Sequence, residues 1–278
     1  MTEDEFIAAL RPLATGAASR NLRDDVAVLG DLVLTHDVLV EGIHFRPGDD
    51  PADVAWKLVA VNLSDLAAAG AVPVGVLLGY PLGDGAWDQR FLLGLEDVLG
   101  KYNVPLLGGD TVKGPRVLGL TALGHSTRVP GRGSARDGDR LWVTGRIGLA
   151  GLGLRGEGGA EAAAAFLRPW PRLEEGQALA PVAHAMMDVS DGLLLDAARM
   201  AEASGLAVVI ALEDVPVAGD PLAAVTAGDD YQLLFALPPD LEPEVAAACI
   251  GGFETGAGLT LVHDEKVLPL PGRLGWKH

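Results

Sequence analysis

The segment from residue 51 to residue 70 has the clearest helical pattern in the chain. Between Lys57 and Gly70 it is apolar on almost every side, with Ala at many positions, which is typical of a helix buried on all faces. Asp50 can cap its first turn, Pro51 suits the first helical position, and Gly70 is a C-terminal stop. The pattern therefore predicts a central, buried helix.

Three polar residues interrupt this apolar segment: Asn62, Ser64 and Asp65. A buried carboxylate needs a hydrogen-bond partner, a cation or a metal, because an unpaired charge in an apolar interior is very unfavourable. Asn62 and Asp65 are three positions apart, so they share one face of the helix. We expect Asp65 to belong to a functional site; the alternative is that it faces solvent.

The first half of the chain alternates strands and helices around this segment. Thr2 and Glu5 form a capping box for a short N-terminal helix, and residues 26–29 and 32–35 predict a hairpin. His36 and Asp37 are expected where the second hairpin strand ends. The later pattern predicts strands at 74–80, 104–107 and 116–124 and a helix at 86–102. This order predicts an α+β fold in which helices cover one face of a mixed sheet.

A second αβ half follows a polar, Gly-rich segment at 132–139, so we expect one domain at 1–131 and another at 132–278. Beyond a strand at 140–144 lies the Gly-rich run 145–159. It lacks the Gly-Lys-Ser/Thr ending of a Walker phosphate-binding loop, so it indicates either a phosphate-facing lid or an ordinary loop. We expect Ser190 or Asp191 to cap a helix at 193–204. The remaining predicted elements are a helix at 173–184, strands at 186–189 and 207–212, and a strand that ends at 235.

Composition and charge exclude several classes of protein. The 278 residues carry a net charge of −17, which argues against a nucleic-acid binder. The acidic N-terminus does not resemble a targeting peptide, and no apolar run is long enough to cross a membrane. Cys249 is the single cysteine, so no internal disulfide can form. We expect a cytoplasmic protein with no membrane or nucleic-acid partner.

Aspartates recur where apolar strands are predicted to end, which is where αβ folds build their sites. For any one of them, scatter over the surface is a sufficient explanation. Together, without His or Cys nearby, they favour Mg²⁺, which phosphoryl transfer from a nucleotide requires. These residues are Asp24, Asp25, Asp37, Asp110, Asp188, Asp191, Asp229 and Asp230.

Six motifs, in order along nearly the whole chain, resemble the thiamine-monophosphate kinase family. They are Asp24-Asp25, Thr35-His-Asp-Val-Leu-Val-Glu-Gly-Ile-His-Phe45, Ala60-Val-Asn-Leu-Ser-Asp-Leu-Ala-Ala-Ala-Gly70, Leu107-Gly-Gly-Asp-Thr111, Asp188-Val-Ser-Asp-Gly-Leu193 and Gly228-Asp-Asp-Tyr-Gln-Leu233. That family is grouped with aminoimidazole-ribonucleotide synthetase and selenophosphate synthetase. The resemblance implies a ferredoxin-like N-terminal domain with a mixed sheet, a C-terminal αβ domain of the synthetase type, and a homodimer formed through the N-terminal half.

The resemblance also implies roles for individual residues. Mg²⁺ would be held by Asp25, Thr35, His36, Asp37, Asp65, Asp110, Asp188 and Asp191. ATP would contact Gly109, Asp110, Arg132 and Ser190. Thiamine monophosphate would contact His44, Asp229 and Trp276, the last within a Gly275–His278 ending that matches the family only in part.

The activity that follows from the resemblance is a Mg²⁺-dependent transfer of the γ-phosphoryl group of ATP onto thiamine monophosphate, giving thiamine diphosphate. No protein side chain is expected to act as a chemical catalyst, because the acceptor oxygen is already deprotonated. Two alternatives remain open at this point: another ATP-dependent synthetase of the same superfamily, or a non-catalytic acidic protein that binds metal ions.

Overall fold

A computed structural model describes residues 1–277. Its α-helices are α1 (Glu3–Leu10), α2 (Pro51–Ala68), α3 (Gly85–Tyr102), α4 (Leu149–Leu154), α5 (Gly159–Leu167), α6 (Leu173–Leu179), α7 (Leu193–Ser204) and α8 (Pro221–Val225). Its strands are β1 (Ala27–Leu29), β2 (Leu32–Val40), β3 (Val72–Leu82), β4 (Leu106–Lys113), β5 (Val117–His125), β6 (Arg140–Thr144), β7 (Ala185–Asp188), β8 (Ala207–Ala211), β9 (Leu233–Leu237), β10 (Ala247–Glu254), β11 (Gly258–His263) and β12 (Lys266–Leu268). Short 3₁₀ turns lie at Arg11–Leu13, Ala17–Leu22 and Leu212–Asp214.

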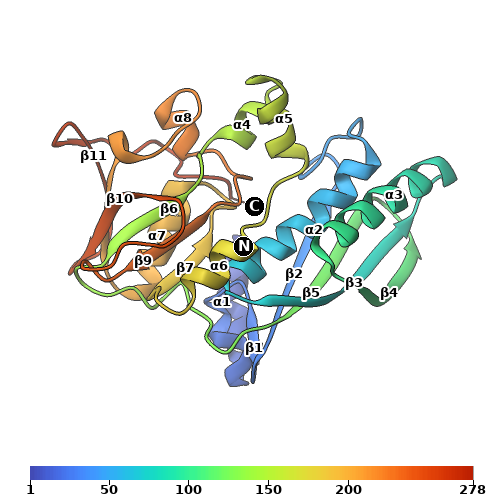
Figure 1. Cartoon of the computed structure of the whole chain (residues 1–278), viewed down its shortest axis with the longest axis horizontal. Helices are drawn as coiled ribbons and strands as arrows, with labels where there is room; N and C mark the ends of the chain where they lie inside the picture. The colour runs from blue at the N-terminus through green and yellow to red at the C-terminus, as the bar shows by residue number, and fades with distance from the viewer. Residues whose placement is uncertain (278) are drawn as a thin grey trace.

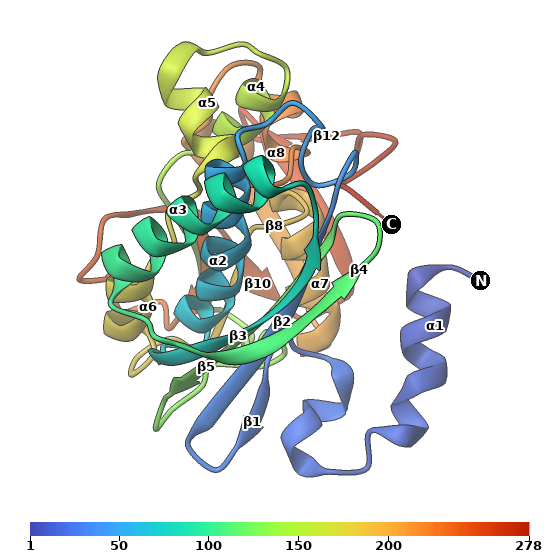
Figure 2. The same ribbon diagram turned by 90° about the vertical axis from the view of Figure 1, so that its right-hand side faces the viewer.

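The strands of residues 1–277 form two sheets, which lie at opposite ends of the molecule in Figure 1. The first has five strands in the order β1-β2-β5-β3-β4, and α2 and α3 cover one of its faces (Figure 2). This confirms the mixed sheet with helices on one side. The connection order is hairpin, helix, strand, helix, strand, strand, which differs from the β-α-β-β-α-β order of a ferredoxin-like domain.

The second sheet has seven strands in the order β12-β11-β8-β10-β6-β9-β7, and its strands β6, β9 and β7 are buried on both faces. Side chains of β9 alternate between these faces, as the period of two in a strand requires. Leu234 and Ala236 join a core with α7, whereas Leu233 and Phe235 join a core with α6 and the end of α2. The expected domain boundary at 131/132 falls in the segment 126–139 between the two sheets and stays a prediction.

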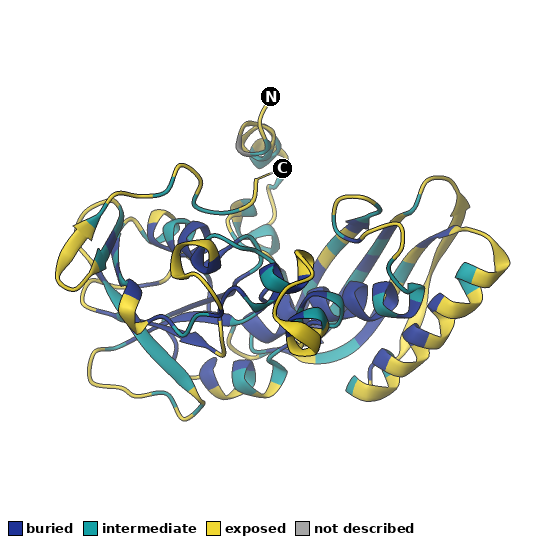
Figure 3. Cartoon of the chain, turned by 90° about the horizontal axis from the view of Figure 1, so that it is seen from above, coloured by how far each residue is buried: buried dark blue, intermediate teal, exposed yellow. Residues whose placement is uncertain are grey.

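Helix α2 lies between the two sheets, and its dark-blue ribbon in Figure 3 reflects burial along nearly its whole length. Its predicted ends are confirmed, since Asp50 accepts a hydrogen bond from the Ala52 N–H and Gly70 adopts φ +60°. The close approach of α6 requires Gly176, because a Cβ there would lie 1.9 Å from the Ala67 carbonyl oxygen. The apolar pattern on all sides of α2 therefore reflects packing against both sheets.

Several predicted boundaries were wrong. Strand β2 continues to Val40, so Asp37 lies inside a strand; β4 runs from Leu106 to Lys113, so the Gly-Gly-Asp-Thr motif lies within it. Tertiary pairing with β5 and β3 extends both strands past the polar residues at which the pattern had suggested an end. Helix α6 ends at Leu179, and the Gly-rich run contains the short helix α4.

The N-terminal capping box is confirmed. The Thr2 side chain accepts a hydrogen bond from the Glu5 N–H at 3.3 Å, and the Glu5 carboxylate accepts one from the Thr2 N–H at 2.9 Å. Helix α1 stands apart from the two sheets in Figure 2. Among residues 1–277, no helix has both the length and the apolar character that are needed to cross a bilayer.

Candidate functional site

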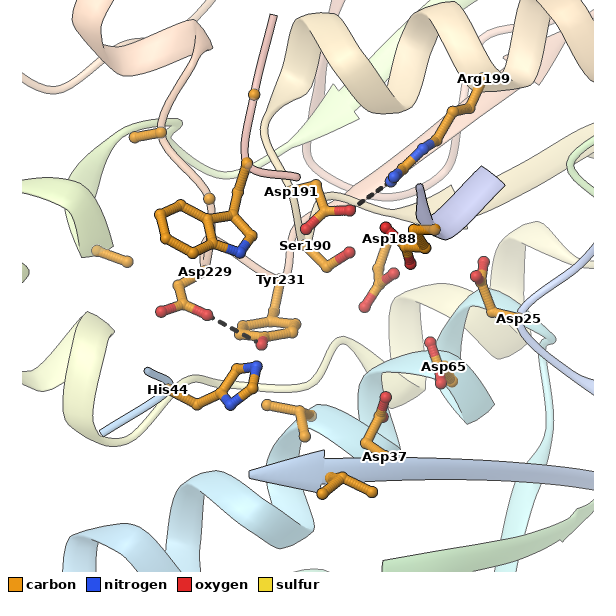
Figure 4. A pocket seen from close by; sticks show the side chains of 18 of the residues that line it. Asp25, Asp37, His44, Asp65, Asp188, Ser190, Asp191, Arg199, Asp229 and Tyr231 are labelled. Carbon is orange, nitrogen blue, oxygen red and sulfur yellow. Dashed lines mark hydrogen bonds and ion pairs between the residues drawn. The ribbon is translucent and has the colours of Figure 1, made fainter. Parts of the chain in front are cut away.

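A cavity of about 1390 Å³ is lined by residues from both halves of the chain. Figure 4 shows carboxylates that enter it from several elements: Asp37 on β2, Asp65 on α2, and Asp188 and Asp191 around the end of β7. Most of the residues that the sequence singled out are therefore brought together here.

Asp25, Asp65 and Asp188 form the closest acidic group of the cavity. Each offers one carboxylate oxygen, and these oxygens all lie within 4.8 Å of one another. Asp25 precedes β1, Asp65 lies in the C-terminal half of α2, and Asp188 ends β7. Three distant segments thus supply an oxygen-only set of donors, the kind that Mg²⁺ prefers.

Buried hydroxyl groups orient two of these carboxylates. The Thr35 hydroxyl donates to Asp65 at 2.5 Å, and the Ser64 hydroxyl donates to Asp188 at 2.5 Å. Burial raises the pKa of Asp65 well above its ordinary value, and the nearby Asp37, Asp188 and Asp25 raise it further. Burial, and then Asp25, also raises the pKa of Asp188. The residues fit a divalent cation, because a bound cation would relieve this repulsion.

Strand β2 directs its residues alternately to two sides. Thr35 and Asp37 face α2: the Asp37 N–H donates to the Asn62 side-chain oxygen at 3.1 Å, and burial followed by Asp25 raises the pKa of Asp37 to about 6. His36 points to the other side, where its Nδ1 lies 2.9 Å from the Thr121 hydroxyl. The His36 ring is therefore directed away from the carboxylates that face α2.

The turn at 190–192 is held by Asp196, which the sequence analysis did not identify. The buried Asp196 carboxylate accepts hydrogen bonds from the backbone N–H groups of Ser190, Asp191 and Gly192 at 3.0–3.2 Å. The expectation that Ser190 or Asp191 caps α7 was therefore wrong: Gly192 is at the N-cap, and the cap comes from inside the helix. An Asp that follows three leucines in the first turn of the helix was the available signal.

Arginines line the same cavity. Arg132, in the segment between the sheets, is paired with Asp25, and Arg199 on α7 is paired with Asp191. Guanidinium groups bind phosphate oxygens in a bidentate manner. The cavity therefore combines carboxylate oxygens that can bind a metal ion with N–H groups that can bind phosphate. The arginines that line it are Arg11, Arg23, Arg132, Arg155, Arg199 and Arg273.

The residues expected to contact the acceptor lie in another part of this cavity. His44 follows β2, and its Nδ1 accepts a hydrogen bond from the Val40 N–H at 2.9 Å. Asp229 precedes β9 with φ +68°, and it is bound by the Tyr231 hydroxyl at 3.1 Å and by Lys57 Nζ at 2.8 Å. Sequence reasoning missed Lys57 and Tyr231, although a lysine within the apolar helix was a visible signal.

Trp276 lines the cavity with half of its surface exposed, and its backbone N–H donates to the Asp191 carbonyl oxygen at 2.8 Å. The preceding Gly275 lies so close that a Cβ there would be 2.4 Å from the same oxygen. The segment is therefore packed against the 190–192 turn and is not a frayed tail. His278, the last residue of the expected ending, lies outside the described residues.

Gly109 and Asp110 lie elsewhere. Among the described residues that line the cavity, neither is present, and both are exposed on the edge strand β4. Across the sheet, Asp110 on β4 pairs with Gly79 on β3, and Gly79 pairs with Gly119 on β5. Gly119 in turn pairs with Val38 on β2. Since paired residues point to the same side of a sheet, Asp110 and Val38 share the face opposite α2. In the single chain, these two residues are not brought to the other site residues.

Comparison with known proteins agrees with this arrangement. Residues 23–126 match the family model of the AIR synthase related protein N-terminal domain, and residues 136–254 match that of its C-terminal domain. Thiamine-monophosphate kinase of Caulobacter vibrioides is 38% identical, over 100% of this chain and 91% of that protein. The enzyme of the same name from Haemophilus influenzae is 34% identical, over 88% of this chain and 86% of its own length.

A solved structure, AaThiL complexed with AMPPCP and TMP, is 29% identical and superposes with a TM-score of 0.87, over 100% of this chain and 97% of that chain. Both halves of the chain, their order and the arrangement of the two sheets are thus shared with that structure. On this evidence, the chain belongs to the AIR synthase related proteins and, within them, to the thiamine-monophosphate kinase family.

Proposed function

We propose that this enzyme transfers the γ-phosphoryl group of ATP directly onto the phosphate of thiamine monophosphate, forming thiamine diphosphate in a Mg²⁺-dependent reaction. The observation that supports it best is the convergence of Asp25, Asp65 and Asp188, whose oxygens lie within 4.8 Å of one another. The relatives named above carry this activity in their names, and AaThiL was solved with AMPPCP and TMP.

The chemistry asks little of the protein beyond placement and charge. The attacking atom is a phosphate oxygen that is deprotonated at neutral pH, so no strong general base is needed. Mg²⁺, when bound, neutralises phosphate oxygens and holds donor and acceptor in line. The proposed metal ligands are Asp25, Thr35, His36 through its carbonyl, Asp37, Asp65, Asp188 and Asp191, together with Asp110.

The two substrates are proposed to occupy different parts of the cavity. The phosphates of ATP would be bound near Arg132 and Ser190, beside the carboxylates, and Gly109 would complete that site. Thiamine monophosphate would lie near His44, Asp229 and Trp276. An indole ring can stack on the aminopyrimidine or attract the thiazolium cation, which fits the half-exposed Trp276.

Asp110 and Gly109 can take part only if a second copy supplies them, so we propose a homodimer formed by the outer face of the first sheet. That face exposes apolar side chains beside Asp110: Val38, Leu77, Val112 and Val117. A second copy packed there would cover these side chains. It would also present its Asp110 to the neighbouring protein chain.

The test is an assay of ADP release by the purified protein with ATP, with and without Mg²⁺ and each acceptor. We expect turnover with thiamine monophosphate and Mg²⁺ together, and none with free thiamine, which lacks the accepting phosphate. Equal rates with free thiamine would refute the proposal. ADP release that depends on an amide or a selenide would favour a synthetase, and Mg²⁺ binding without any turnover would favour a non-catalytic protein.

A further inference from the structure

Lys57 is a buried lysine on α2, only 2% exposed, at the boundary between the two halves of the chain. Its ammonium group donates to the His44 carbonyl oxygen at 3.1 Å and to Asp229 Oδ2 at 2.8 Å. It also lies 4.0 Å from the centroid of the Phe166 ring on α5. One cation therefore connects the loop after β2 in the first half with the loop before β9 in the second.

Asp229 is held in place by these contacts. Its second oxygen, Oδ1, accepts the Tyr231 hydroxyl at 3.1 Å, so each carboxylate oxygen has one fixed donor. Its backbone has φ +68°, the left-handed conformation that Asp adopts more readily than most residues other than Gly. The side chain keeps 28% of its surface exposed, and Asp229 lines the cavity. Lone pairs of the carboxylate can thus accept hydrogen bonds from a ligand in the cavity.

The ammonium group also changes what Asp229 can do. At 2.8 Å in a buried setting, the positive charge of Lys57 offsets much of the negative charge of the carboxylate. The Asp229 carboxylate therefore attracts a cationic ligand less strongly than an unpaired carboxylate would. Recognition at Asp229 then depends on the direction of its free lone pairs, which Lys57 and Tyr231 fix in advance.

We propose that Lys57 is a positioning residue for the acceptor: it fixes the Asp229 carboxylate in the geometry that binds thiamine monophosphate, without touching ATP. This inference rests on the proposed function. If it holds, binding of the acceptor depends on a contact between α2 and the loop before β9. It therefore depends on how the two halves of the chain are aligned.

The test compares steady-state kinetics of four variants: Lys57→Met, Tyr231→Phe, Asp229→Asn, and the double variant Lys57→Met with Asp229→Asn. We expect Lys57→Met to raise the KM for thiamine monophosphate about ten-fold and to leave the KM for ATP within about two-fold. Tyr231→Phe, which removes the other fixed donor, should act in the same direction. The double variant should be no worse than Asp229→Asn alone, because Lys57 acts through Asp229.

Arg46→Met is the matched control. Arg46 also lies over the Phe166 ring, at 5.1 Å, but its hydrogen bonds go to Asp49 and not to Asp229. Loss of this second cation should leave both KM values unchanged. A similar rise in Arg46→Met and Lys57→Met would attribute the effect to packing around Phe166 and overturn the proposal.

Other outcomes are equally decisive. A lower KM for thiamine monophosphate in Lys57→Met would mean that the ammonium competes with the cationic substrate. Additive losses in the double variant would mean that Lys57 acts independently of Asp229. Each of these outcomes overturns the proposal. If Lys57→Met does not fold, Tyr231→Phe decides, since an unchanged KM for the acceptor there refutes a role for the fixed carboxylate. A wild-type enzyme that does not use thiamine monophosphate refutes the proposed function instead.

Discussion

Buried carboxylates at close range are the main feature of this chain at the scale of single residues. Asp65 is 9% exposed and Asp188 is 2% exposed, and each accepts a short hydrogen bond from a hydroxyl group, donated by Thr35 and Ser64 respectively. Like charges in an apolar setting oppose ionisation, which is why the pKa of both carboxyl groups is raised. Such an arrangement destabilises the protein unless a cation binds.

Asp65→Asn is therefore expected to lower activity by about a hundred-fold or more without unfolding the protein. Asn keeps an oxygen that can accept the Thr35 hydroxyl but removes the charge. Without Mg²⁺, the thermal midpoint of the variant should equal or exceed that of the wild type. The rise that Mg²⁺ causes in the wild type should be absent or much smaller. Thermal unfolding with and without Mg²⁺, together with the ADP assay, measures both effects.

Asp53→Asn provides the control on the same helix. Asp53 lies in the first turn of α2, where it pairs with Arg168 outside the cavity. The same chemical change there should leave activity and the effect of Mg²⁺ essentially as they are. If Asp65→Asn retained full activity, or if it unfolded while Asp53→Asn did not, Asp65 would be a structural residue and the metal site proposed here would be wrong.

At the scale of elements, α2 is the part of the chain on which the two sheets meet. Its apolar side chains pack under the first sheet, and Ala67 and Ala68 join the core of the second sheet with Leu179 of α6. Small residues allow this close packing, and Gly176 has the tightest contact, with its Cα facing the Ala67 carbonyl. The positions of Asp65 and Lys57 relative to the second half depend on this contact.

Gly176→Ala should destabilise the protein by about 1–3 kcal/mol, because the added methyl would lie 1.9 Å from the Ala67 oxygen and force α6 away from α2. Gly100→Ala is the matched control: Gly100 lies in α3, and an added Cβ would meet nothing within 4 Å. There the same change should stabilise by about 0.5–1 kcal/mol. Chemical denaturation of both variants decides; equal stabilities would show that α6 can shift without loss.

For the whole molecule, the outer face of the first sheet is the surface that the single chain leaves uncovered. Val38, Leu77, Val112 and Val117 are exposed there, and Asp110 lies among them although it is absent from the described lining of the cavity. Helices α2 and α3 cover only the other face (Figure 2). A dimer through this face would explain the apolar side chains and the location of Asp110 together.

Leu77→Glu should therefore convert the dimer into a monomer and lower activity, since burial of the new charge would be strongly unfavourable. Leu92→Glu on α3 is the control, because Leu92 is also exposed but lies away from this sheet face. Light scattering at micromolar concentration and the ADP assay test both variants. A wild-type protein that is monomeric, or a fully active Leu77→Glu monomer, would exclude the proposed dimer.

The sequence by itself determined the features of the fold that depend on residues close together in the chain. The bounds of α2 follow from Asp50, Pro51 and Gly70, which act within one turn of the helix, and the capping box of α1 follows from Thr2 and Glu5 in the same way. The motifs also identified the family, because residue types in a fixed order along the chain carry that information. The two αβ halves and the candidate aspartates could be named without a structure.

Tertiary structure alone decided what depends on distant residues. The sequence could not show that Asp25, Asp65 and Asp188 converge, that Lys57 binds Asp229, or that Asp110 faces away from them. Strand pairing moved the predicted ends of β2 and β4. Each of these features joins segments far apart in the chain or depends on which face a strand presents. Contacts between distant segments and the face of a strand are set by the packing of α2 between two sheets and not by any local pattern.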